Sequence, residues 1–238
     1  MLNNNGIQFI EESHEYFLGD LKLRGISHLY GKHINPDKYA DVPESVLRKA
    51  AERGTRIHDE CRQADLFGYA ESTESKNYIE LMQDNGFKVL ESEYLVTDFQ
   101  HFATAIDKVC TLNDKVCIGD IKTTYVLDED SLKWQLSICA YLFELCNPTI
   151  KVEKLFGIWL RDDKKKIVEI DRLSNEVIID LLDCEITGRP FSAPVVKVEG
   201  VDEALIKLSE LESLILVAET ELETKKKDVE TIKAYLLE

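Results

Sequence analysis

Two acidic residues stand inside apolar, strand-like runs of this 238-residue chain. Asp107 follows Phe-Ala-Thr-Ala-Ile, and Asp120 follows Val-Cys-Ile-Gly. A carboxylate among apolar residues costs free energy unless another group compensates its charge. Lys122 stands two positions beyond Asp120, and strand side chains repeat with a period of two, so both would lie on one side of a strand. The spacing therefore indicates acids that are paired with a positive charge.

A divalent cation would explain why two acids occupy such positions. The strands that carry Asp107 and Asp120 are expected to pair through a turn at Asn113-Asp114, which brings the carboxylates to one end of the sheet. Neighbouring carboxylates resist joint ionisation, and Mg²⁺ or Mn²⁺, as hard cations, favour oxygen ligands. Lys122 would then hold or deprotonate an attacking water, or stabilise an anionic transition state. The alternative is an exposed Asp-x-Lys ion pair on an edge strand.

A helix upstream carries a further candidate ligand. It is expected to begin at Asp41 as N-cap, with Pro43 in its first turn. Gly54 and His58 are four residues apart and share one helical face. Glycine costs about 0.5–1 kcal/mol relative to alanine in a helix, which favours a close approach to another backbone. His58 is a candidate metal ligand, the alternative being a core histidine on this apolar face. The face is completed by Leu47, Ala50, Ala51, Ile57 and Cys61.

Basic residues lie beside that face, at Lys49, Arg53 and Arg56. Such a stripe could follow a phosphate backbone next to the metal, or it could be a solvated helix surface. The formal net charge of −16 opposes nucleic-acid binding, because phosphate is bound largely by Lys and Arg. Contacts with DNA would therefore come from local patches or from bound metal.

The remaining elements that must position these residues can be read from periodicity and turn signals. Residues 6–30 indicate a small hairpin followed by a short helix, and helical periods or strand alternation mark the rest. Helices are expected over 73–84, 128–146 and 174–187, and strands over 88–96, 102–112, 115–124 and the hairpin 154–173. This order predicts an α/β fold, with helices packed around a mixed central sheet.

Four motifs in this order resemble the PD-(D/E)XK nuclease superfamily, most closely its RecB-like branch with the lambda-exonuclease-like phage recombination exonucleases. They are Gly-Thr-Arg-Ile-His at 54–58, Ala-Ile-Asp at 105–107, Ile-Gly-Asp-Ile-Lys-Thr-Thr at 118–124 and Trp-Gln-Leu-Ser-Ile-Cys-Ala-Tyr at 134–141. The resemblance runs from about residue 8 to residue 190. It implies a restriction-endonuclease-like core within a nuclease domain over residues 1–198.

The resemblance also implies roles for individual residues. The implied ligands of Mg²⁺ or Mn²⁺ are His58, Asp107, Asp120 and the backbone carbonyl of Ile121. Lys122 would serve the attacking water, and Gln135 would assist near the DNA. The implied activity is a metal-dependent DNA exonuclease that acts on DNA ends in phage or prophage recombination or repair, with endonuclease action left open. A phage-encoded enzyme of this kind would work in the bacterial cytosol.

The chain departs from the family pattern in two places. Ala105 stands where the family has glycine, and Cys139 stands where a tyrosine usually follows the glutamine by four residues. Tyr141 is a second-tier candidate for the missing tyrosine, although six residues separate it from Gln135. Glu93 matches an acid often present on the first strand of the family, and it is also second tier, because an edge-strand ion pair would explain it equally well.

The last forty residues, 199–238, have a different pattern. Apolar residues recur with heptad spacing, which is typical of a coiled coil. The heptad positions are Val201, Leu208, Ile215, Leu222, Val229 and Leu236, with Ala204, Leu211, Ala218, Lys225 and Ile232 between them. Residues 201–236 are therefore expected to mediate self-association or docking to a partner, for which a single-strand annealing protein is one candidate. The alternative is one amphipathic helix folded back on the nuclease domain.

Composition limits the remaining functions. No apolar run reaches the length of a membrane span, and the N-terminus lacks the pattern of a signal peptide, so a cytoplasmic location without membrane contact is expected. The six cysteines are scattered and form no Cys-x-x-Cys pair, which indicates buried free thiols and argues against a CRISPR-associated relative with an iron–sulfur cluster. The second hypothesis is a nuclease-fold binding module that recognises DNA ends or a protein partner without cleavage.

Overall fold

The computed structural model describes residues 2–193, 222, 225–227 and 229. The chain divides into two compact units, residues 1–193 and 194–238, close to the boundary expected at 198. In the second unit the described residues are helical. The predicted coiled coil over 199–238, with its proposed partner contacts, otherwise lies outside the described residues.

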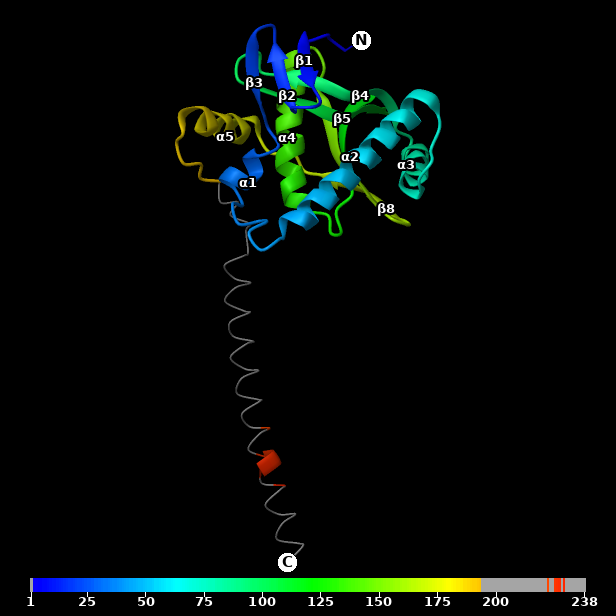
Figure 1. The fold of residues 1–238 in the computed structure, drawn as a ribbon, viewed down its shortest axis with the longest axis vertical. Helices are drawn as coiled ribbons and strands as arrows, with labels where there is room; N and C mark the ends of the chain where they lie inside the picture. Colours follow the sequence, from blue (N-terminus) through cyan, green and yellow to red (C-terminus); the bar gives the residue numbers. More distant parts are fainter. Residues whose placement is uncertain (1, 194–221, 223–224, 228, 230–238) are drawn as a thin grey trace, which may run out of the picture. The chain divides into compact units, whose positions relative to one another are not determined.

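A mixed sheet forms the centre of the first unit, and helices cover both of its faces (Figure 1). This confirms the predicted mixed α/β architecture. The strands of its described part are β1 Ile7–Ile10, β2 Glu15–Leu18, β3 Leu21–Gly25, β4 Lys88–Thr97, β5 Phe102–Leu112, β6 Lys115–Lys122, β7 Val152–Arg161 and β8 Lys164–Ile170. The helices are α1 Leu29–His33, α2 Glu44–Phe67, α3 Thr73–Asp84, α4 Glu129–Cys146 and α5 Asn175–Thr187.

Strand β5 organises the sheet because it has three neighbours. It pairs with β4 in the antiparallel sense along one edge. Along the other edge its first residues pair with β3 in parallel, and its last residues pair with β6 through the predicted turn. Asn113 and Asp114 in that turn have φ of 51° and 62°, a conformation that Asn and Asp adopt more readily than most residues. Strand β6 then runs parallel to β7, which pairs with β8 as the expected hairpin.

Two predictions about the N-terminal third need correction. The expected hairpin contains an additional strand, because β1 pairs with β2 ahead of the β2–β3 turn. The helix α2 begins at Glu44 with Pro43 as its N-cap, and not at Asp41. A proline disfavours helical backbone in the residue before it, so Val42 ends the preceding turn and the helix starts only after Pro43.

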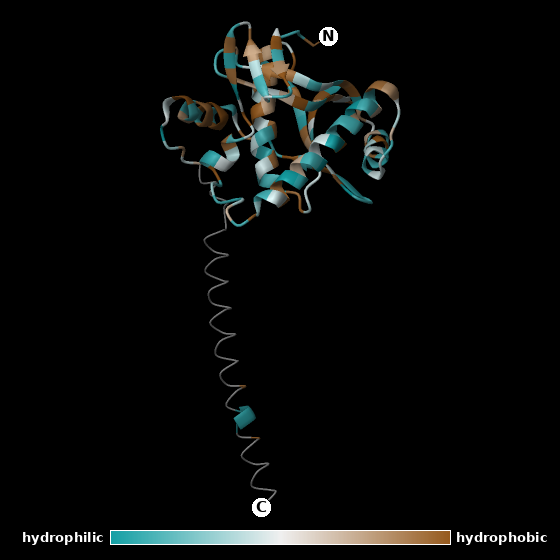
Figure 2. Ribbon diagram, viewed as in Figure 1, coloured by the Kyte–Doolittle hydropathy of each residue, from teal (hydrophilic) through white to brown (hydrophobic). Residues whose placement is uncertain are grey.

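Each face of the sheet has its own hydrophobic core. On one face, Leu132 and Leu142 of α4 pack with Ile178 of α5. On the other face, Ile57 of α2 and Tyr78 of α3 pack against the sheet. Figure 1 shows α2 running diagonally to one side of α4, towards α3, and Figure 2 shows hydrophilic residues along much of α2. Among the described residues no helix has both the length and the apolar character to cross a membrane.

The apolar face predicted for α2 is buried only in its C-terminal half. Ile57 and Cys61 are fully buried, whereas Ala50 and Ala51 are exposed. Gly54 also differs from expectation. A Cβ added there would lie 3.7 Å from Thr123 Oγ1, an ordinary contact with a side chain, so no close backbone approach requires this glycine.

Close packing of α4 on the sheet depends on a different glycine. Gly157 of β7 pairs with Asp120 of β6, and a Cβ at position 157 would lie 2.4 Å from Leu132 Cδ2 of α4. The missing side chain therefore lets α4 approach the sheet beside Asp120. That approach brings Gln135, on the same helix, within reach of Asp120.

A charged cluster joins α1 to α5, and it makes the stability of the first unit depend on pH. Glu185 Oε2 lies 2.7 Å from Lys32 Nζ and 2.6 Å from His33 Nε2, and its Oε1 lies 3.4 Å from His28 Nε2. Burial by itself would raise the pKa of Glu185, but hydrogen bonds from Lys32, His33 and His28 outweigh it and lower the pKa to about 2. The ionised carboxylate is therefore favoured in the folded state.

Glu185→Gln is expected to lower the free energy of unfolding near pH 7 by about 1–2 kcal/mol, a value reduced by solvent screening of the exposed partners. A depressed pKa contributes stability above the ordinary value of 4.5, and that contribution is lost as the pH falls towards 2. The difference between variant and wild type should therefore shrink below pH 5. Urea unfolding from pH 7 to pH 3 measures it, with Glu169→Gln, at an exposed ion pair with Lys154, as control. A constant difference across this range would contradict the assignment.

Candidate metal centre

The centre of the candidate site is a place where two paired strands separate. The last ladder pair between β5 and β6 joins Lys108 to Gly119. Beyond it, Asp107 Oδ2 accepts a hydrogen bond of 2.7 Å from the backbone N–H of Ile121. A side chain thus replaces the next rung of the ladder, and it fixes the Asp107 carboxylate between the strands.

His58 reaches this carboxylate from α2. Its Nε2 donates to the carbonyl oxygen of Ile121 over 2.9 Å, and its Nδ1 lies 3.3 Å from Asp107 Oδ2. A neutral imidazole that donates through Nε2 presents a lone pair at Nδ1. A lone pair facing a carboxylate oxygen at this distance requires a proton or a metal ion between them. The side chains of His58 and Asp107 and the carbonyl oxygen of Ile121 therefore meet as three groups that can coordinate a metal ion.

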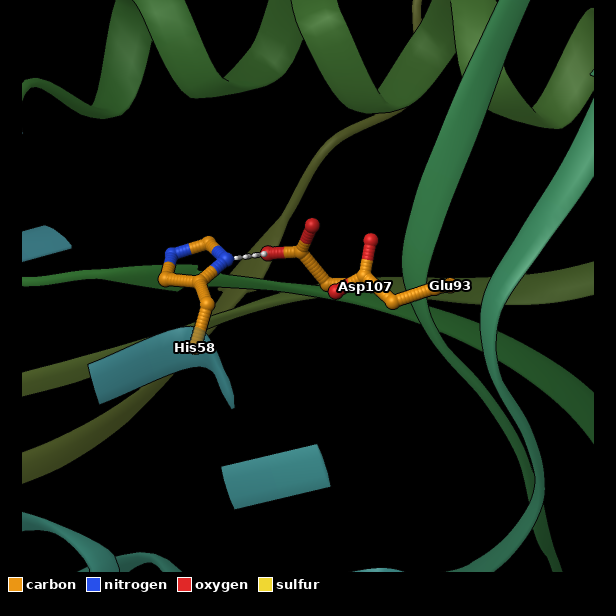
Figure 3. Close-up of side chains that lie close together, drawn as sticks. All are labelled: His58, Glu93 and Asp107. Atoms are coloured by element: carbon orange, nitrogen blue, oxygen red, sulfur yellow. Dashed lines mark ion pairs between the residues drawn. The ribbon is translucent and has the colours of Figure 1, made fainter. Parts of the chain in front are cut away.

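Glu93 of β4 also belongs to this group, although the sequence supported it only as a second-tier candidate. One donor atom each from His58, Glu93 and Asp107 lie within 4.8 Å of one another. Figure 3 shows the Asp107 carboxylate between the imidazole and the carboxyl group of Glu93. The backbone of Glu93 has φ of 56°, in the left-handed region that glutamate rarely adopts. Burial and the charge of Asp107 raise the pKa of Glu93 to about 7, so a cation at this point would favour its ionised form.

A second set of contacts holds Asp120. Lys122 Nζ lies 2.6 Å from Asp120 Oδ2, and it donates to Gln135 Oε1 over 2.9 Å. Gln135 Nε2 in turn donates to Asp120 Oδ1 over 2.6 Å. The three side chains form a closed triangle between the end of β6 and α4. Asp120 and Lys122 thus lie on one side of the strand, as the two-residue spacing predicts.

The electrostatics of this triangle reflect burial and mutual charge. Asp120 is 4% exposed, and burial followed by the charge of Asp107 raises its pKa to about 6, despite the opposing effect of Lys122. Burial would lower the pKa of Lys122, but Asp120 and Asp107 outweigh it and raise that pKa. Lys122 therefore carries its charge at neutral pH, and one amine faces two buried carboxylates.

The residues present fit a hard divalent cation. Asp120 Oδ2 is buried and receives no hydrogen bond, although it is in ionic contact with Lys122. A cation bound here would be shared by His58 Nδ1 and the Asp107 carboxylate, and it would relieve the mutual repulsion of the acids. Carboxylate and carbonyl oxygens with one imidazole are ligands that Mn²⁺ accepts, and the oxygens suit Mg²⁺. In the described part of the chain, His58, Glu93 and Asp107 are the cluster of three such side chains close enough to share an ion.

The basic stripe on α2 is largely engaged in ion pairs. Arg53 binds Glu74 and Asp162 over 2.5 and 3.0 Å, and Arg56 binds Glu60 over 2.5 Å. Lys49 is exposed. These contacts leave Lys49 more accessible to a phosphate than Arg53, because DNA would have to displace two acids from that guanidinium.

On α4, the second-tier Tyr141 is not brought to the site. It packs against the hydrophobic core, where burial and then the charge of Asp98 raise the pKa of its hydroxyl. Cys139, at the position where the family has its tyrosine, is buried in the same core. Burial and the charges of Asp120 and Asp107 raise the pKa of its thiol, which keeps it neutral.

A buried network on the other face of β5 joins the elements that carry the site, and no local sequence pattern predicted it. Lys108, 1% exposed, forms an ion pair with Asp65 of α2 and donates to Ser92 Oγ of β4 over 3.0 Å. Asp65 accepts hydrogen bonds from Tyr78 over 2.7 Å and Ser92 over 2.6 Å. Lys108 and Ser92 directly adjoin Asp107 and Glu93 in sequence. The network therefore locks α2 against β4 and β5 at the level of the candidate ligands.

Comparison with known proteins gives no family for the chain. No protein-family model matches it, and no curated protein matches it. Among solved structures, the crystal structure of SSO0001 is similar to 75% of this chain and 81% of that one, with 17% sequence identity and a TM-score of 0.42. A likeness at that level carries no argument about function.

Proposed function

We propose that the protein is a divalent-metal-dependent DNA nuclease with a restriction-endonuclease-like core. The observation that carries the proposal is a pair of adjoining groups at the point where β5 and β6 separate. His58, Glu93, Asp107 and the Ile121 carbonyl form the first group, and Asp120 with Lys122 forms the second. An arrangement with this many acidic groups is costly to bury without a cation, which favours a functional role over a purely structural one.

The ligands proposed for Mg²⁺ or Mn²⁺ are His58, Asp107, Asp120 and the carbonyl of Ile121, with Glu93 as a further carboxylate at the same point. When bound, the cation supplies Lewis-acid activation of a phosphoryl oxygen and charge neutralisation at the leaving oxygen. Asp107 holds Ile121 through its backbone N–H and so fixes the position of the carbonyl.

Lys122 and Gln135 have separate proposed roles. The charged amine of Lys122 positions the attacking water and stabilises negative charge that develops on the phosphate. Gln135 holds both Lys122 and Asp120, so it fixes the direction of the amine. Lys49 is the proposed backbone contact, followed by Arg53 and Arg56 once their acidic partners are displaced.

A cleavage assay tests this proposal. Purified full-length protein should degrade linear DNA with Mg²⁺ or Mn²⁺ and stop on addition of a chelator. An exonuclease, the form suggested by the motifs, should spare covalently closed circular DNA and release nucleotides from an end-labelled linear duplex. Cleavage of circular DNA would assign an endonuclease, and no metal-dependent cleavage of any DNA would contradict the proposal.

A non-cleaving binding module is the second candidate, and one observation favours it. Arg53 and Arg56 are neutralised by acids, and the chain carries a formal charge of −16. A calorimetric titration with Mn²⁺ separates the two candidates. The nuclease should bind Mn²⁺ and be stabilised by it, and Asp107→Asn should weaken both effects. Neither heat nor stabilisation would favour the binding module.

A further inference from the structure

The loop after Lys122 exposes an aromatic side chain next to the candidate metal centre. Tyr125 is 81% exposed and Val126 is 72% exposed. Thr123, which links them to Lys122, is buried. Three residues of extended chain span about 10–11 Å. The backbone of Tyr125 therefore lies no farther than this from the backbone of Lys122, and the ring of Tyr125 faces solvent.

Polar contacts anchor this loop to the sheet. Trp159 Nε1 donates to the carbonyl oxygen of Thr124 over 2.8 Å, and Arg161 Nη1 donates to that of Thr123 over 3.2 Å. Thr124 Oγ1 also donates to the carbonyl oxygen of Val126 over 2.8 Å. An exposed apolar ring on an anchored loop is not explained by core packing, because it buries almost no surface.

The guanidinium of Arg161 lies beside the same ring. Its Cζ is 5.8 Å from the centre of the Tyr125 ring, within the range of a cation–π contact. An aromatic ring with an adjacent arginine is a combination on which nucleobases stack. Arg161 Nε also lies 3.3 Å from Asp162 Oδ2, so the guanidinium serves here as a partner of the ring and not as a free phosphate contact. Bases inside a duplex have both faces covered by neighbours. A ring of this kind therefore selects an unpaired or terminal base.

We propose that Tyr125 is a stacking platform for an unpaired base at the DNA end, with Arg161 as its cationic partner. The proposal rests on the nuclease function above and adds a substrate class to it, namely ends with single-stranded nucleotides. Tyr125 follows Lys122 by three residues, so a base stacked on the ring would bring a nearby phosphate of the same strand towards the end of β6 that carries Lys122.

The test uses full-length protein and a duplex with a three-nucleotide overhang containing 2-aminopurine, whose fluorescence falls on stacking. Binding is measured with Ca²⁺, and cleavage is measured separately with Mg²⁺. Wild type should quench the overhang fluorescence. Tyr125→Ala should abolish the quench and weaken overhang binding about fivefold or more, with blunt duplex affected less. Tyr125→Phe, which keeps the ring, should behave as wild type.

Tyr69→Ala is the matched control. Tyr69 is also an exposed tyrosine, 61% accessible, but it follows the C-terminal end of α2. It should leave quenching and binding unchanged. If wild type cleaves DNA and Tyr125→Ala matches wild type in quenching and affinity, the stacking role of Tyr125 is wrong and the nuclease proposal stands. If wild type neither binds nor cleaves the DNA, the nuclease proposal fails and the platform fails with it.

Discussion

Lys122→Met is expected to reduce metal-dependent turnover of linear DNA by about 100- to 1,000-fold, the effect of removing one preorganised group that stabilises developing charge. Methionine keeps most of the length of the side chain but removes the amine that contacts Asp120 and Gln135. Asp120→Asn should cause a loss at least as large, because it removes a metal ligand while keeping the shape. Single-turnover cleavage of an end-labelled duplex measures both variants.

Stability should separate these two variants. Lys122→Met leaves two buried carboxylates without their counter-charge, so it should also lower the melting temperature when metal is absent. Asp120→Asn removes one of two repelling carboxylates, so its melting temperature should not fall comparably. Lys154→Met, at an exposed ion pair with Glu169, is the control and should keep full activity. Wild-type turnover in either site variant would remove Lys122 or Asp120 from the proposed chemistry.

Lys108→Met is expected to have the largest effect on folding, lowering the free energy of unfolding by about 3–5 kcal/mol. The amine of Lys108 is fully buried, and its removal leaves the Asp65 carboxylate without its cation. It also removes the cation that lies 4.9 Å from the Tyr78 ring centre. Guanidinium-induced unfolding measures the loss, with Lys115→Met, at an exposed pair with Glu153, as control.

A second change should recover part of that loss. In the double variant Lys108→Met, Asp65→Asn, no charge is left buried alone, and the new amide can still accept from Tyr78 and donate to Ser92. The double variant should therefore be more stable than Lys108→Met alone, and the double-mutant cycle gives the coupling energy. Purely additive losses would mean that Lys108 and Asp65 do not act as a pair.

Local sequence patterns were sufficient for much of the fold. Alternation of apolar and polar residues predicted β4, β5 and β6, and Asn113-Asp114 predicted the turn between the last two. That turn fixes the register, which in turn sets Asp107 near Asp120. The two-residue spacing then placed Lys122 beside Asp120. These inferences worked because each depends on neighbours in the chain or on a single hairpin.

Features that depend on distant parts of the chain could not be predicted in this way. The ion pair of Arg53 with Asp162 joins α2 to the β7–β8 turn, so the sequence showed only a basic stripe where the structure has neutralised side chains. The burial of Lys108 depends on Asp65, 43 residues away. The parallel pairing of β3 with β5 likewise joins segments that no local pattern connects.

The left-handed backbone of Glu93 has a consequence for how the protein would respond to selection. A non-glycine residue in this conformation carries a strain of about 1 kcal/mol or more, which asparagine or glycine would largely relieve. Selection for thermal stability alone would therefore replace glutamate at this position, which would give a more stable protein with one carboxylate fewer at the proposed cation site. If related proteins retain the acid at this position, its function outweighs the stability that it costs.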